Sequence, residues 1–504
     1  MPSLTYSLRS ALWQLHFITP RGVYTWCRSF MREGVTLMTL FAYASSIYPH
    51  REAIIYEGEI YSYERLYRKA LALARLMHGH YGLKSGNRVA LLCRNHVDLV
   101  LLLPALSRLG VGVHLLNTDM SREQVANRLL GQSRYDLLII DEELTARCLP
   151  QEGLVIPHIT IESLKDVSDG KQIDLKRLPR VWRGAELAVL TGGSSGTYKE
   201  ASRRPSALNF LPPLLALIRS IGIHQGSTTY VALPLYHGFG LATLLISLVM
   251  GKRIWLTRRF RECEALKGID RYGVDVLPIV PVMLARMMQL PEASEQLKSL
   301  RCIISGGDRL DRKLVAEVHR QVAPIIYNLY GTSEAGFFLL ATPSDLDRYP
   351  EESTLGYPIR GVQCDLHDKD AHGVGVLWVR SRWAMQSKQN AWQSTGDRMF
   401  CDADGFYFHR GRADRMVVCA GENVYPELVE RTLEAHPEVV AARVYAVESA
   451  RFGNVLEARV ELLPQSSCTE SALLDWLRSR LSRAECPHAI LFGALDILST
   501  GKRA

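Results

Sequence analysis

The stretch Leu187-Ala-Val-Leu-Thr-Gly-Gly-Ser-Ser-Gly-Thr-Tyr-Lys199 decides how the whole sequence is interpreted. It runs from apolar residues straight into glycines and hydroxyl side chains, and it ends in a lysine. Glycines let backbone N–H groups surround a ligand, and the hydroxyls and the lysine add donors and a positive charge. The stretch therefore favours a strand followed by a polyphosphate-binding loop, although a flexible surface loop is typical of the same string in isolation. It is not a Walker loop, in which lysine directly follows glycine.

Short apolar runs alternate with helical patterns on both sides of this loop, from about residue 50 to 420. Several runs are apolar throughout, which indicates strands buried on both faces of a sheet. The predicted strands are Val89–Cys93, Gly112–Leu116, Leu137–Ile140, Leu154–Ile156, Leu187–Leu190, Thr229–Leu233, Val276–Ile279 and Arg301–Ile304. Between them, segments such as Tyr63–His78 carry apolar residues at helical spacing. This alternation predicts an α/β fold with largely parallel sheets.

The last ninety residues predict a separate α+β unit. A helix is expected to begin at Pro426, strands are expected at Val439–Ala446 and Leu456–Leu462, and Ser467 with Glu470 forms a capping-box pattern before a second helix. We therefore expect two domains. The large N-terminal domain spans residues 1–411, with helices sandwiching parallel-type sheets, and the small mobile C-terminal domain spans residues 415–504, with a hinge near 412–414.

Composition excludes several classes of protein. The ten cysteines contain no Cys-x-x-Cys pair, which argues against a disulfide framework or a zinc site and favours a reducing, cytoplasmic location. A net charge of +8 is mild for 504 residues and suits anionic ligands, and no nucleic-acid-binding signature is present. The most apolar run, Phe239–Met250, is much shorter than the roughly 20 residues that span a bilayer.

The first 32 residues combine basic and aromatic side chains without any acidic one. The residues are Arg9, Arg21, Arg28 and Arg32, with Tyr6, Trp13, Phe17, Tyr24, Trp26 and Phe30. Such a segment, here residues 1–40, could contact a membrane surface peripherally or act as a transit peptide. The interpretation we favour is an N-terminal helix that packs on its own domain.

Further motifs follow the glycine-rich loop in a fixed order. They are Pro234–His237, Ser305–Gly307, Tyr330–Glu334, Ser394–Asp397, Gly411–Asp414 with Gly421–Glu427, and Ser499–Lys502. Together with Thr191–Lys199 they resemble the signatures of the adenylate-forming superfamily, which includes acyl-CoA synthetases, aryl-CoA ligases, luciferases and the adenylation domains of peptide synthetases. The resemblance covers nearly the whole chain from about residue 40 and is strongest to fatty acyl-CoA synthetases.

This resemblance implies a set of residues that bind ATP. They are Thr191, Ser194, Ser195, Gly196, Lys199, Gly306, Gly307, Tyr330, Ser333, Asp397 and Arg412. The loop residues are expected at the β- and γ-phosphates and Ser333 at the α-phosphate. Tyr330 is expected to stack on adenine, beside Gly306 and Gly307, while Asp397 and Arg412 bind the ribose.

The resemblance also implies catalytic and hinge residues. Glu334 is expected to hold Mg²⁺, for which a carboxylate oxygen is a suitable ligand. Lys502 is expected to bridge the acid's carboxylate and the α-phosphate, and His237 to lie beside that carboxylate and control access of the thiol. Asp414 corresponds to the hinge about which the small domain rotates between two half-reactions. The Val418–Val424 loop would then line the thiol channel.

The implied activity is ATP-dependent conversion of a carboxylic acid to an acyl-adenylate, followed by transfer to coenzyme A. The segment Tyr236–Leu245, which continues from the Pro234–His237 motif, contains no acidic residue that could hold an ammonium group. A plain carboxylic acid is therefore favoured over an amino acid. Leu241, Leu244 and Leu245 suggest a medium- or long-chain fatty acid. An acyl-AMP ligase that loads an acyl carrier protein is an alternative.

Two residues depart from the family pattern. Tyr198 replaces a proline and Glu200 replaces a glycine around the loop lysine. They raise the alternative of a catalytically silent ATP-binding homologue. The retained charged residues, from Lys199 to Lys502, argue against that alternative.

Overall fold

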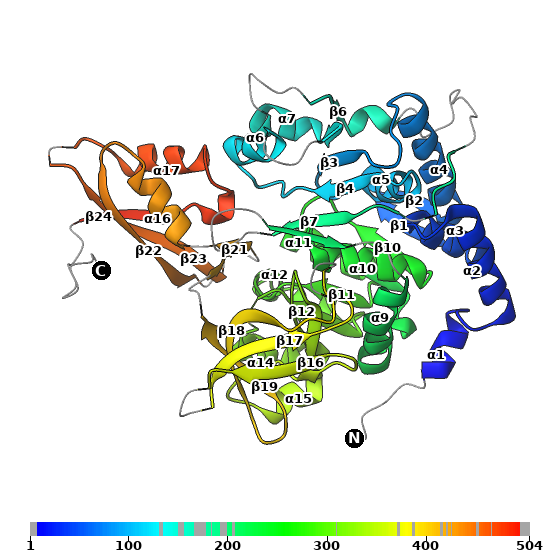
Figure 1. Cartoon of the computed structure of the whole chain (residues 1–504). Helices are drawn as coiled ribbons and strands as arrows, with labels where there is room; N and C mark the ends of the chain where they lie inside the picture. Colours follow the sequence, from blue (N-terminus) through cyan, green and yellow to red (C-terminus); the bar gives the residue numbers. More distant parts are fainter. Residues whose placement is uncertain are drawn as a thin grey trace.

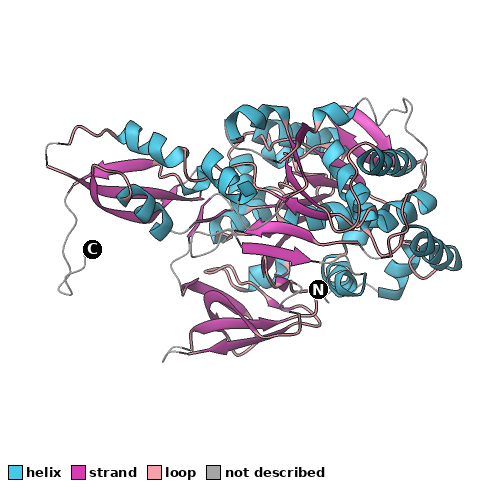
Figure 2. Cartoon of the chain, turned by 45° about the horizontal axis from the view of Figure 1, so that its top comes forward, coloured by secondary structure: helices cyan, strands magenta, loops and turns pink. Residues whose placement is uncertain are grey.

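The computed structural model describes residues 8–130, 135–149, 156–165, 178–182, 184–191, 199–203, 207–308, 310–369, 373–385, 389–413, 417–419, 422–424, 426–449, 453–464 and 466–493. Figure 1 shows a large α/β body, and beside it a smaller unit formed by the C-terminal part of the chain. Figure 2 shows helices packed around the strands of the large body. The predicted fold class is therefore confirmed.

A nine-stranded sheet forms the centre of the large body, in the order β15-β14-β13-β12-β11-β9-β10-β1-β2. Its strands are β1 Glu52–Tyr56, β2 Glu59–Ser62, β9 Thr228–Val231, β10 Arg253–Leu256, β11 Val276–Ile279, β12 Cys302–Gly306, β13 Ile326–Thr332, β14 Gly336–Ala341 and β15 Tyr357–Pro358. The neighbouring strands β13, β12, β11, β9, β10 and β1 pair in parallel. The outer strands β2, β14 and β15 run antiparallel to their neighbours. Parallel pairing places the carboxyl ends of the central strands along one edge.

A six-stranded sheet lies above it in Figure 1, in the order β6-β5-β3-β4-β7-β8. Its strands are β3 Arg88–Leu92, β4 Gly112–Leu115, β5 Leu137–Ile140, β6 His158–Thr160, β7 Leu187–Thr191 and β8 Lys199–Arg203. All pairs are parallel except β7 with β8. The strand predicted at Leu154–Ile156 falls mostly outside the described residues, and β6 begins two residues after it, at His158.

Helices cover both faces of these sheets. Near the nine-stranded sheet and between the two sheets lie α3 Leu37–Ile47, α4 Tyr63–Gly79, α5 Val97–Arg108, α9 Ala207–Ile221 and α10 Gly238–Val249. On the opposite face lie α11 Glu262–Tyr272, α12 Pro281–Met288, α13 Ala293–Gln296, α14 Arg312–Gln321 and α15 Pro343–Arg348. The six-stranded sheet is covered by α6 Arg122–Leu130 and α7 Glu142–Cys148. Short 3-10 turns are η1 Glu162–Leu164 and η2 Ile223–Gln225.

Alternation along the central strands explains their apolar sequences. Val276 and Ile304 point into the core that contains α3 and α10, whereas Leu277 and Ile303 point into the core beneath α11 and α12. Successive side chains of a strand point to opposite faces, so both faces of β11 and β12 are buried. This is the arrangement that the uninterrupted apolar runs predicted.

A third, antiparallel sheet follows the parallel ones, and the sequence did not predict it. It consists of β16 Gln363–His367, β17 Gly375–Arg380, β18 Gln393–Cys401 and β19 Tyr407–Arg412. Its inner face packs against β14 through a separate apolar cluster that includes Phe338, Leu377 and Met399.

The small unit has its own sheet and its own core. It contains β20 Val417–Cys419, β21 Glu422–Val424, β22 Val439–Ser449, β23 Gly453–Leu462 and β24 Ala489–Phe492, with α16 Pro426–Glu434, α17 Glu470–Arg478 and η4 Arg483–Glu485. The helix expected at Pro426 is present. The predicted cap of α17 is wrong by two residues, because Thr469 rather than Ser467 accepts the hydrogen bond from the N–H of Ala472. The boundary and hinge at 412–414 stay predictions, and Asp414 lies outside the described residues.

The N-terminal segment forms α1 Leu8–Gln14 and α2 Pro20–Glu33, and α2 packs on the large body. The Trp26 ring stacks on that of Tyr43 in α3, with ring centroids 3.9 Å apart. At the end of α2, the carboxylate of Glu33 is 2% exposed and accepts hydrogen bonds from Arg108 Nε at 2.8 Å and from Tyr67 Oη at 2.6 Å. In the described part of the chain, no helix is long and apolar enough to cross a bilayer.

Removing Arg108 tests how firmly α2 is held. Arg108→Ala leaves the buried Glu33 carboxylate with Arg32 as its remaining cation, 3.0 Å away and 56% exposed. We therefore expect the free energy of unfolding to fall by about 2 kcal/mol, through loss of a buried, charge-assisted hydrogen bond. Arg261→Ala, which removes an exposed partner of Glu264, is the control and should change it by less than about 0.5 kcal/mol. Urea denaturation measures the free energy of unfolding of both variants. Equal losses would show that the Arg108–Glu33 ion pair does not stabilise the chain.

Candidate active site

The candidate site lies where the chain leaves the carboxyl ends of the parallel strands. A cavity of about 2600 Å³ opens there, lined by residues that follow β9, β11, β12 and β13, together with part of β18 and residues of the small unit. Its polar end is formed near Tyr330 and Asp397, and its apolar end is formed by α10, α9 and α3. Such a cavity can hold a nucleotide and an apolar acid end to end.

Tyr330 and Asp397 meet at the polar end, although 66 residues separate them in the sequence. Tyr330 Oη donates a hydrogen bond to Asp397 Oδ2, and His409 Nε2 lies 3.5 Å from Asp397 Oδ1. Arg412 is the backbone partner of Asp397 in the β18–β19 register. The Tyr330 ring also contacts Phe338 edge to face, at 5.1 Å between centroids. The residues expected at adenine and ribose are thus neighbours, with a nearly buried carboxylate among them.

Gly306 and Gly307 end β12 beside this site. A Cβ on Gly306 would lie 2.6 Å from the Leu329 carbonyl oxygen, so only glycine allows β12 and β13 to pair there. The same atom would lie 3.3 Å from the ring of Phe239. Gly307 has a φ of +84°, a conformation that favours glycine. Both positions therefore require glycine for their backbone geometry, independently of any contact with a nucleotide.

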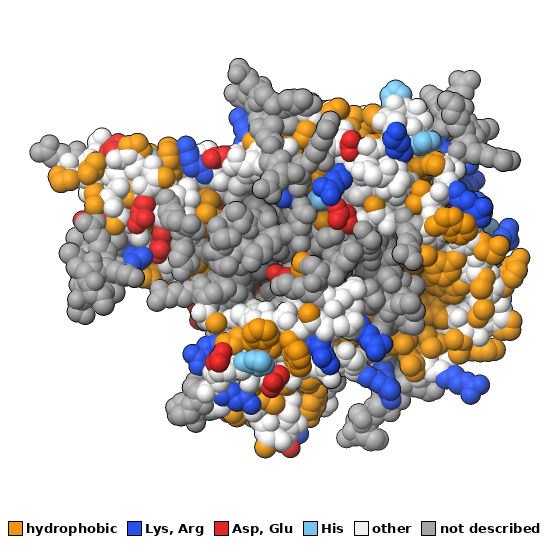
Figure 3. All heavy atoms as spheres, viewed as in Figure 1, with side chains coloured by type: hydrophobic (Ala, Val, Ile, Leu, Met, Phe, Trp, Pro, Cys, Tyr) orange, Lys and Arg blue, Asp and Glu red, His pale blue; other side chains and the backbone are white. Residues whose placement is uncertain are grey.

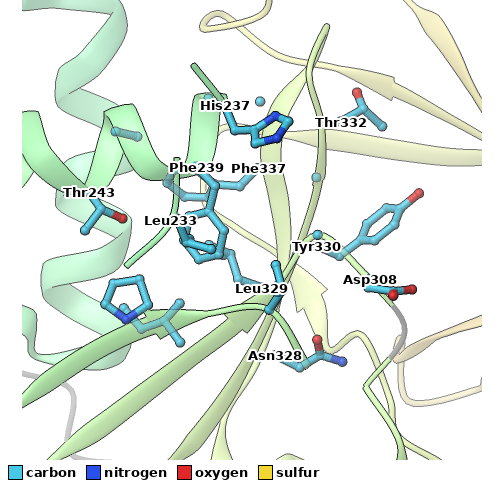
Figure 4. Close-up of a pocket in the computed structure, with 18 of the residues that line it drawn as sticks. Leu233, His237, Phe239, Thr243, Asp308, Asn328, Leu329, Tyr330, Thr332 and Phe337 are labelled. Atoms are coloured by element: carbon cyan, nitrogen blue, oxygen red, sulfur yellow. The ribbon is translucent and has the colours of Figure 1, made fainter. Parts of the chain in front are cut away.

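Phe239 stands between the polar and apolar ends of the cavity. Figure 4 shows its ring among Leu233, Leu329 and Phe337, with His237 and Tyr330 toward one side and Thr243 of α10 toward the other. The turn that carries His237 is fixed by Asn95, whose amide donates to the Leu233 carbonyl at 3.0 Å and accepts from the Leu235 N–H at 2.8 Å. Asn95 therefore holds the turn that places His237 and Phe239 between the two ends of the cavity.

His237 contacts the small unit directly. Its Nε2 lies 3.0 Å from Glu422 Oε1, and the same oxygen accepts a hydrogen bond from Asn117 Nδ2 at 3.0 Å. Burial lowers the pKa of His237, but the charge and hydrogen bond of Glu422 outweigh burial, and the net shift is upward. Burial raises the pKa of Glu422, but His237 and Asn117 lower it more, so the net shift is downward. Both directions describe an imidazolium–carboxylate pair between the two parts of the chain.

Asn117 and Glu422 are the site residues that sequence reasoning missed. Asn117 follows the carboxyl end of β4, a position where polar side chains often gather in parallel sheets. Glu422 stands in the 421–427 stretch that resembles the superfamily's hinge segment, where we gave a role to the loop but none to its carboxylate. Val417, Val418 and Glu422 do line the cavity.

Glu334 and Ser333 also line the cavity, in the loop after β13. Among the described residues no three His, Cys, Asp or Glu side chains form a cluster that could hold a metal by themselves. Magnesium commonly binds through one or two carboxylates together with substrate phosphates and water. Glu334 at the polar end of the cavity fits that kind of site.

The phosphate loop is only partly described. Thr191 ends β7 and pairs in register with Lys199 at the start of β8, so the two ends of the loop meet as a hairpin. Residues 192–198, which include Ser194, Ser195 and Gly196, lie outside the described residues, and so does Lys502. The contacts of these residues therefore stay predictions.

Comparison with known proteins identifies the family of this chain. The pattern of the family described as "AMP-binding enzyme" matches residues 41–387. The chain belongs to this family. A 2-succinylbenzoate–CoA ligase of Geobacillus kaustophilus is 29% identical over 461 residues, which cover 88% of this chain and 91% of the relative. Its counterpart from Bacillus subtilis is 26% identical over 454 residues, covering 87% of this chain and 90% of the relative.

Two solved structures share the fold. An o-succinylbenzoate CoA synthetase of Bacillus subtilis, bound to a product analogue, superposes with a TM-score of 0.78 at 23% identity and covers 92% of this chain and 97% of its own. An amide bond synthetase of Marinactinospora thermotolerans gives 0.78 at 20% identity, with coverage of 95% and 98%.

Membership of the AMP-binding enzymes bears on two predictions. The predicted use of ATP and Mg²⁺, with coenzyme A as co-substrate, is confirmed at the level of the family. The prediction of a fatty acid substrate is not supported by the relatives named above, which carry the name of a different acid.

The His237–Glu422 pair predicts a bell-shaped pH dependence for the contact between the two parts of this AMP-binding enzyme. The raised pKa of His237 means that its contribution is complete below about 6.5 and is lost as pH rises through the raised value. The lowered pKa of Glu422 means that its contribution is complete above about 4.3 and is lost as pH falls through the lowered value. We expect about 1–2 kcal/mol, because both side chains are partly exposed.

Hydrogen exchange of β21, measured across pH and corrected for intrinsic rates, tests this dependence. Protection should be greatest between the two pKa values and should become flat in Glu422→Gln. Glu292→Gln, at an exposed position of the large body, is the control and should keep the bell shape. An unchanged profile in Glu422→Gln would show that the pair does not hold the two parts together.

Proposed function

We propose that the chain is an AMP-forming acid–CoA ligase. The observation that carries the proposal is the continuity of one cavity, in which Tyr330, Asp397 and Glu334 line the polar end and α10 lines the apolar end. His237 stands between them, at the place where an acid carboxylate and an α-phosphate would meet. A cavity of this form supports direct reaction between a nucleotide and a carboxylic acid.

In the first half-reaction a carboxylate oxygen attacks the α-phosphorus of ATP, and the bond to pyrophosphate breaks. The products are acyl-AMP and pyrophosphate. Asp397 and Arg412 would hold the ribose and Tyr330 the adenine, while Lys199 and the hydroxyls of the phosphate loop would hold the β- and γ-phosphates. Mg²⁺, held by Glu334, would neutralise charge on the phosphates. Lys502 would place a cation between the two reacting anions.

In the second half-reaction the thiolate of coenzyme A attacks the acyl carbonyl carbon, and AMP leaves with the oxygen that joined it to the acyl group. Val282 and Asp308 of the large body and Gly453 and Asn454 of the small unit line the same cavity. Coenzyme A would enter between these two parts, and the His237–Glu422 contact would hold the small unit in this orientation. The proposed hinge at Asp414 would allow the unit to turn away for the first half-reaction.

The acid is proposed to have a large apolar body. Leu241, Leu245, Leu214, Leu217 and Leu37 all line the cavity beyond Phe239. No acidic residue occurs in α10, which supports a plain acid over an amino acid. A medium- or long-chain fatty acid fits this lining, and so does a bulky aryl acid of the kind named in the relatives.

The proposal predicts acid-dependent release of pyrophosphate. We would supply Mg²⁺-ATP with fatty, aryl and amino acids, with and without coenzyme A, and measure pyrophosphate. Release should occur with apolar acids, accelerate with coenzyme A and fall by at least 100-fold in Lys502→Ala, because a transition-state contact of about 3 kcal/mol is lost. Lys298→Ala, which removes an exposed lysine paired with Glu295, is the control.

Two other outcomes distinguish the alternatives. Release that coenzyme A does not accelerate would favour an acyl-AMP ligase that loads an acyl carrier protein. Bound ATP without release for any acid would contradict the enzyme and would leave Tyr198 and Glu200 as marks of a catalytically silent homologue.

A further inference from the structure

Helix α2 leaves much of its apolar surface exposed. Its buried residues are Gly22, Thr25, Ser29 and Glu33, which are small or polar, and the half-buried Trp26 packs on Tyr43. The solvent-exposed residues include Val23, Tyr24, Cys27 and Met31, with Tyr24 66% and Met31 73% exposed. Surface helices normally bury their apolar side chains. The exposed apolar face of α2 therefore needs a partner outside the described chain.

This face belongs to a larger apolar patch, which we call the N-terminal patch. It consists of Trp13, Ile18, Val23, Tyr24, Met31, Val35 and Trp182. Figure 3 shows apolar side chains gathered over the part of the surface where Figure 1 places α2 and α3, with basic side chains around them. Single exposed apolar residues are ordinary, but a contiguous patch marks an interaction surface.

The charges around the patch select the class of partner. Arg9, Arg21, Arg28 and Arg32 are exposed on α1 and α2, and the sequence from 8 to 32 contains no acidic residue. The adjacent carboxylate, Glu33, is buried and pairs with Arg108 and with Arg32. A helix with exposed aromatic and aliphatic side chains flanked by arginines suits the interface of an anionic bilayer, where rings enter the headgroup region and arginines meet phosphates.

The cavity of the active site reaches the same patch. Its lining includes Ile18 and Val35, which belong to the patch, and also Phe17, Trp26 and Phe30 beside them. From there the lining continues along α3, α9 and α10 as far as Phe239. The lining residues of these helices include Leu37, Leu40, Leu214, Leu217, Leu241 and Leu245. An apolar route thus joins the N-terminal patch to the reaction site, separately from the polar end of the cavity.

We infer that the N-terminal patch docks on an anionic lipid surface, and that the apolar acid passes from the lipid into the cavity between α1 and α2. This inference rests on the proposed function, since it supplies that function with its substrate. Docking would bury the aromatic and aliphatic face of α2. The acid would move along the apolar path with its carboxylate leading, until the carboxylate reaches His237 and the apolar chain lies toward the patch.

Vesicle flotation of the full chain tests the docking step. The chain should float with phosphatidylglycerol vesicles at low salt, should float at least ten-fold less with phosphatidylcholine vesicles, and should be released by salt because screening weakens the arginine contacts. The double variant Tyr24→Ser/Met31→Ser should reduce the bound fraction at least ten-fold. Neither side chain lines the cavity, so its turnover of a soluble short-chain acid should be unchanged.

Tyr445→Ser is the matched control, because Tyr445 is an exposed aromatic residue (47%) on the small unit, away from the patch. It should bind vesicles like the parent chain. Absence of binding to anionic vesicles at low salt, or equal binding by the double variant, would overturn the inference. A dimer that the double variant dissociates, without vesicle binding, would assign the patch to a second copy of the chain and would also overturn it.

The route of the acid is tested with hexadecanoic acid embedded in the vesicles. Turnover of the embedded acid should fall at least ten-fold in Tyr24→Ser/Met31→Ser, while turnover of soluble butanoic or hexanoic acid stays the same. Equal turnover of the embedded acid by both proteins would contradict transfer from the lipid. Failure with every acid, soluble or embedded, would instead contradict the proposed function, so the two failures are distinguishable.

Discussion

Parallel pairing of β9, β11, β12 and β13 is the constraint on which the candidate site depends. Because these strands run the same way, the segments that leave them emerge along one edge of the sheet. Residues as distant in sequence as His237 and Glu334 therefore line one cavity. Gly306 makes this possible in detail, since any Cβ there would meet the Leu329 carbonyl oxygen and separate β12 from β13.

The parallel sheet supplies only part of the site, and the antiparallel elements complete it. The β18–β19 pair brings Asp397 to Tyr330, and the small unit brings Glu422 to His237 and Asn117. The last contact joins three parts of the chain through one carboxylate. Because this ionisable pair lies between the large body and the small unit, its protonation state can change the orientation of the small unit. An enzyme that runs two half-reactions in one cavity would need such a change of orientation.

Much of the fold could be predicted from the sequence, because a strand buried on both faces must be apolar throughout, as β5 and β11 are. Other strands were not predicted. Among them are the edge strand β8, whose sequence Lys199–Arg203 is mostly polar, and the sheet β16–β19, whose half-exposed strands lack that signal. For the site, the ordered motifs identified Tyr330 and Asp397. They could not show that Glu422 reaches His237, because that contact depends on how two separately folded parts meet. The pattern of α2 indicated a helix, but periodicity alone does not tell which face turns inward.

The central claim is that acid and nucleotide react directly in one cavity, and isotope transfer tests it most directly. The chain would be incubated with ATP, Mg²⁺, coenzyme A and an apolar acid labelled with ¹⁸O in its carboxylate, and the products would be analysed by mass spectrometry. The account predicts that AMP acquires one labelled oxygen, because the carboxylate oxygen that attacks the α-phosphorus leaves with AMP when the thioester forms. Formation of ADP, or of acyl-CoA with unlabelled AMP, would contradict it.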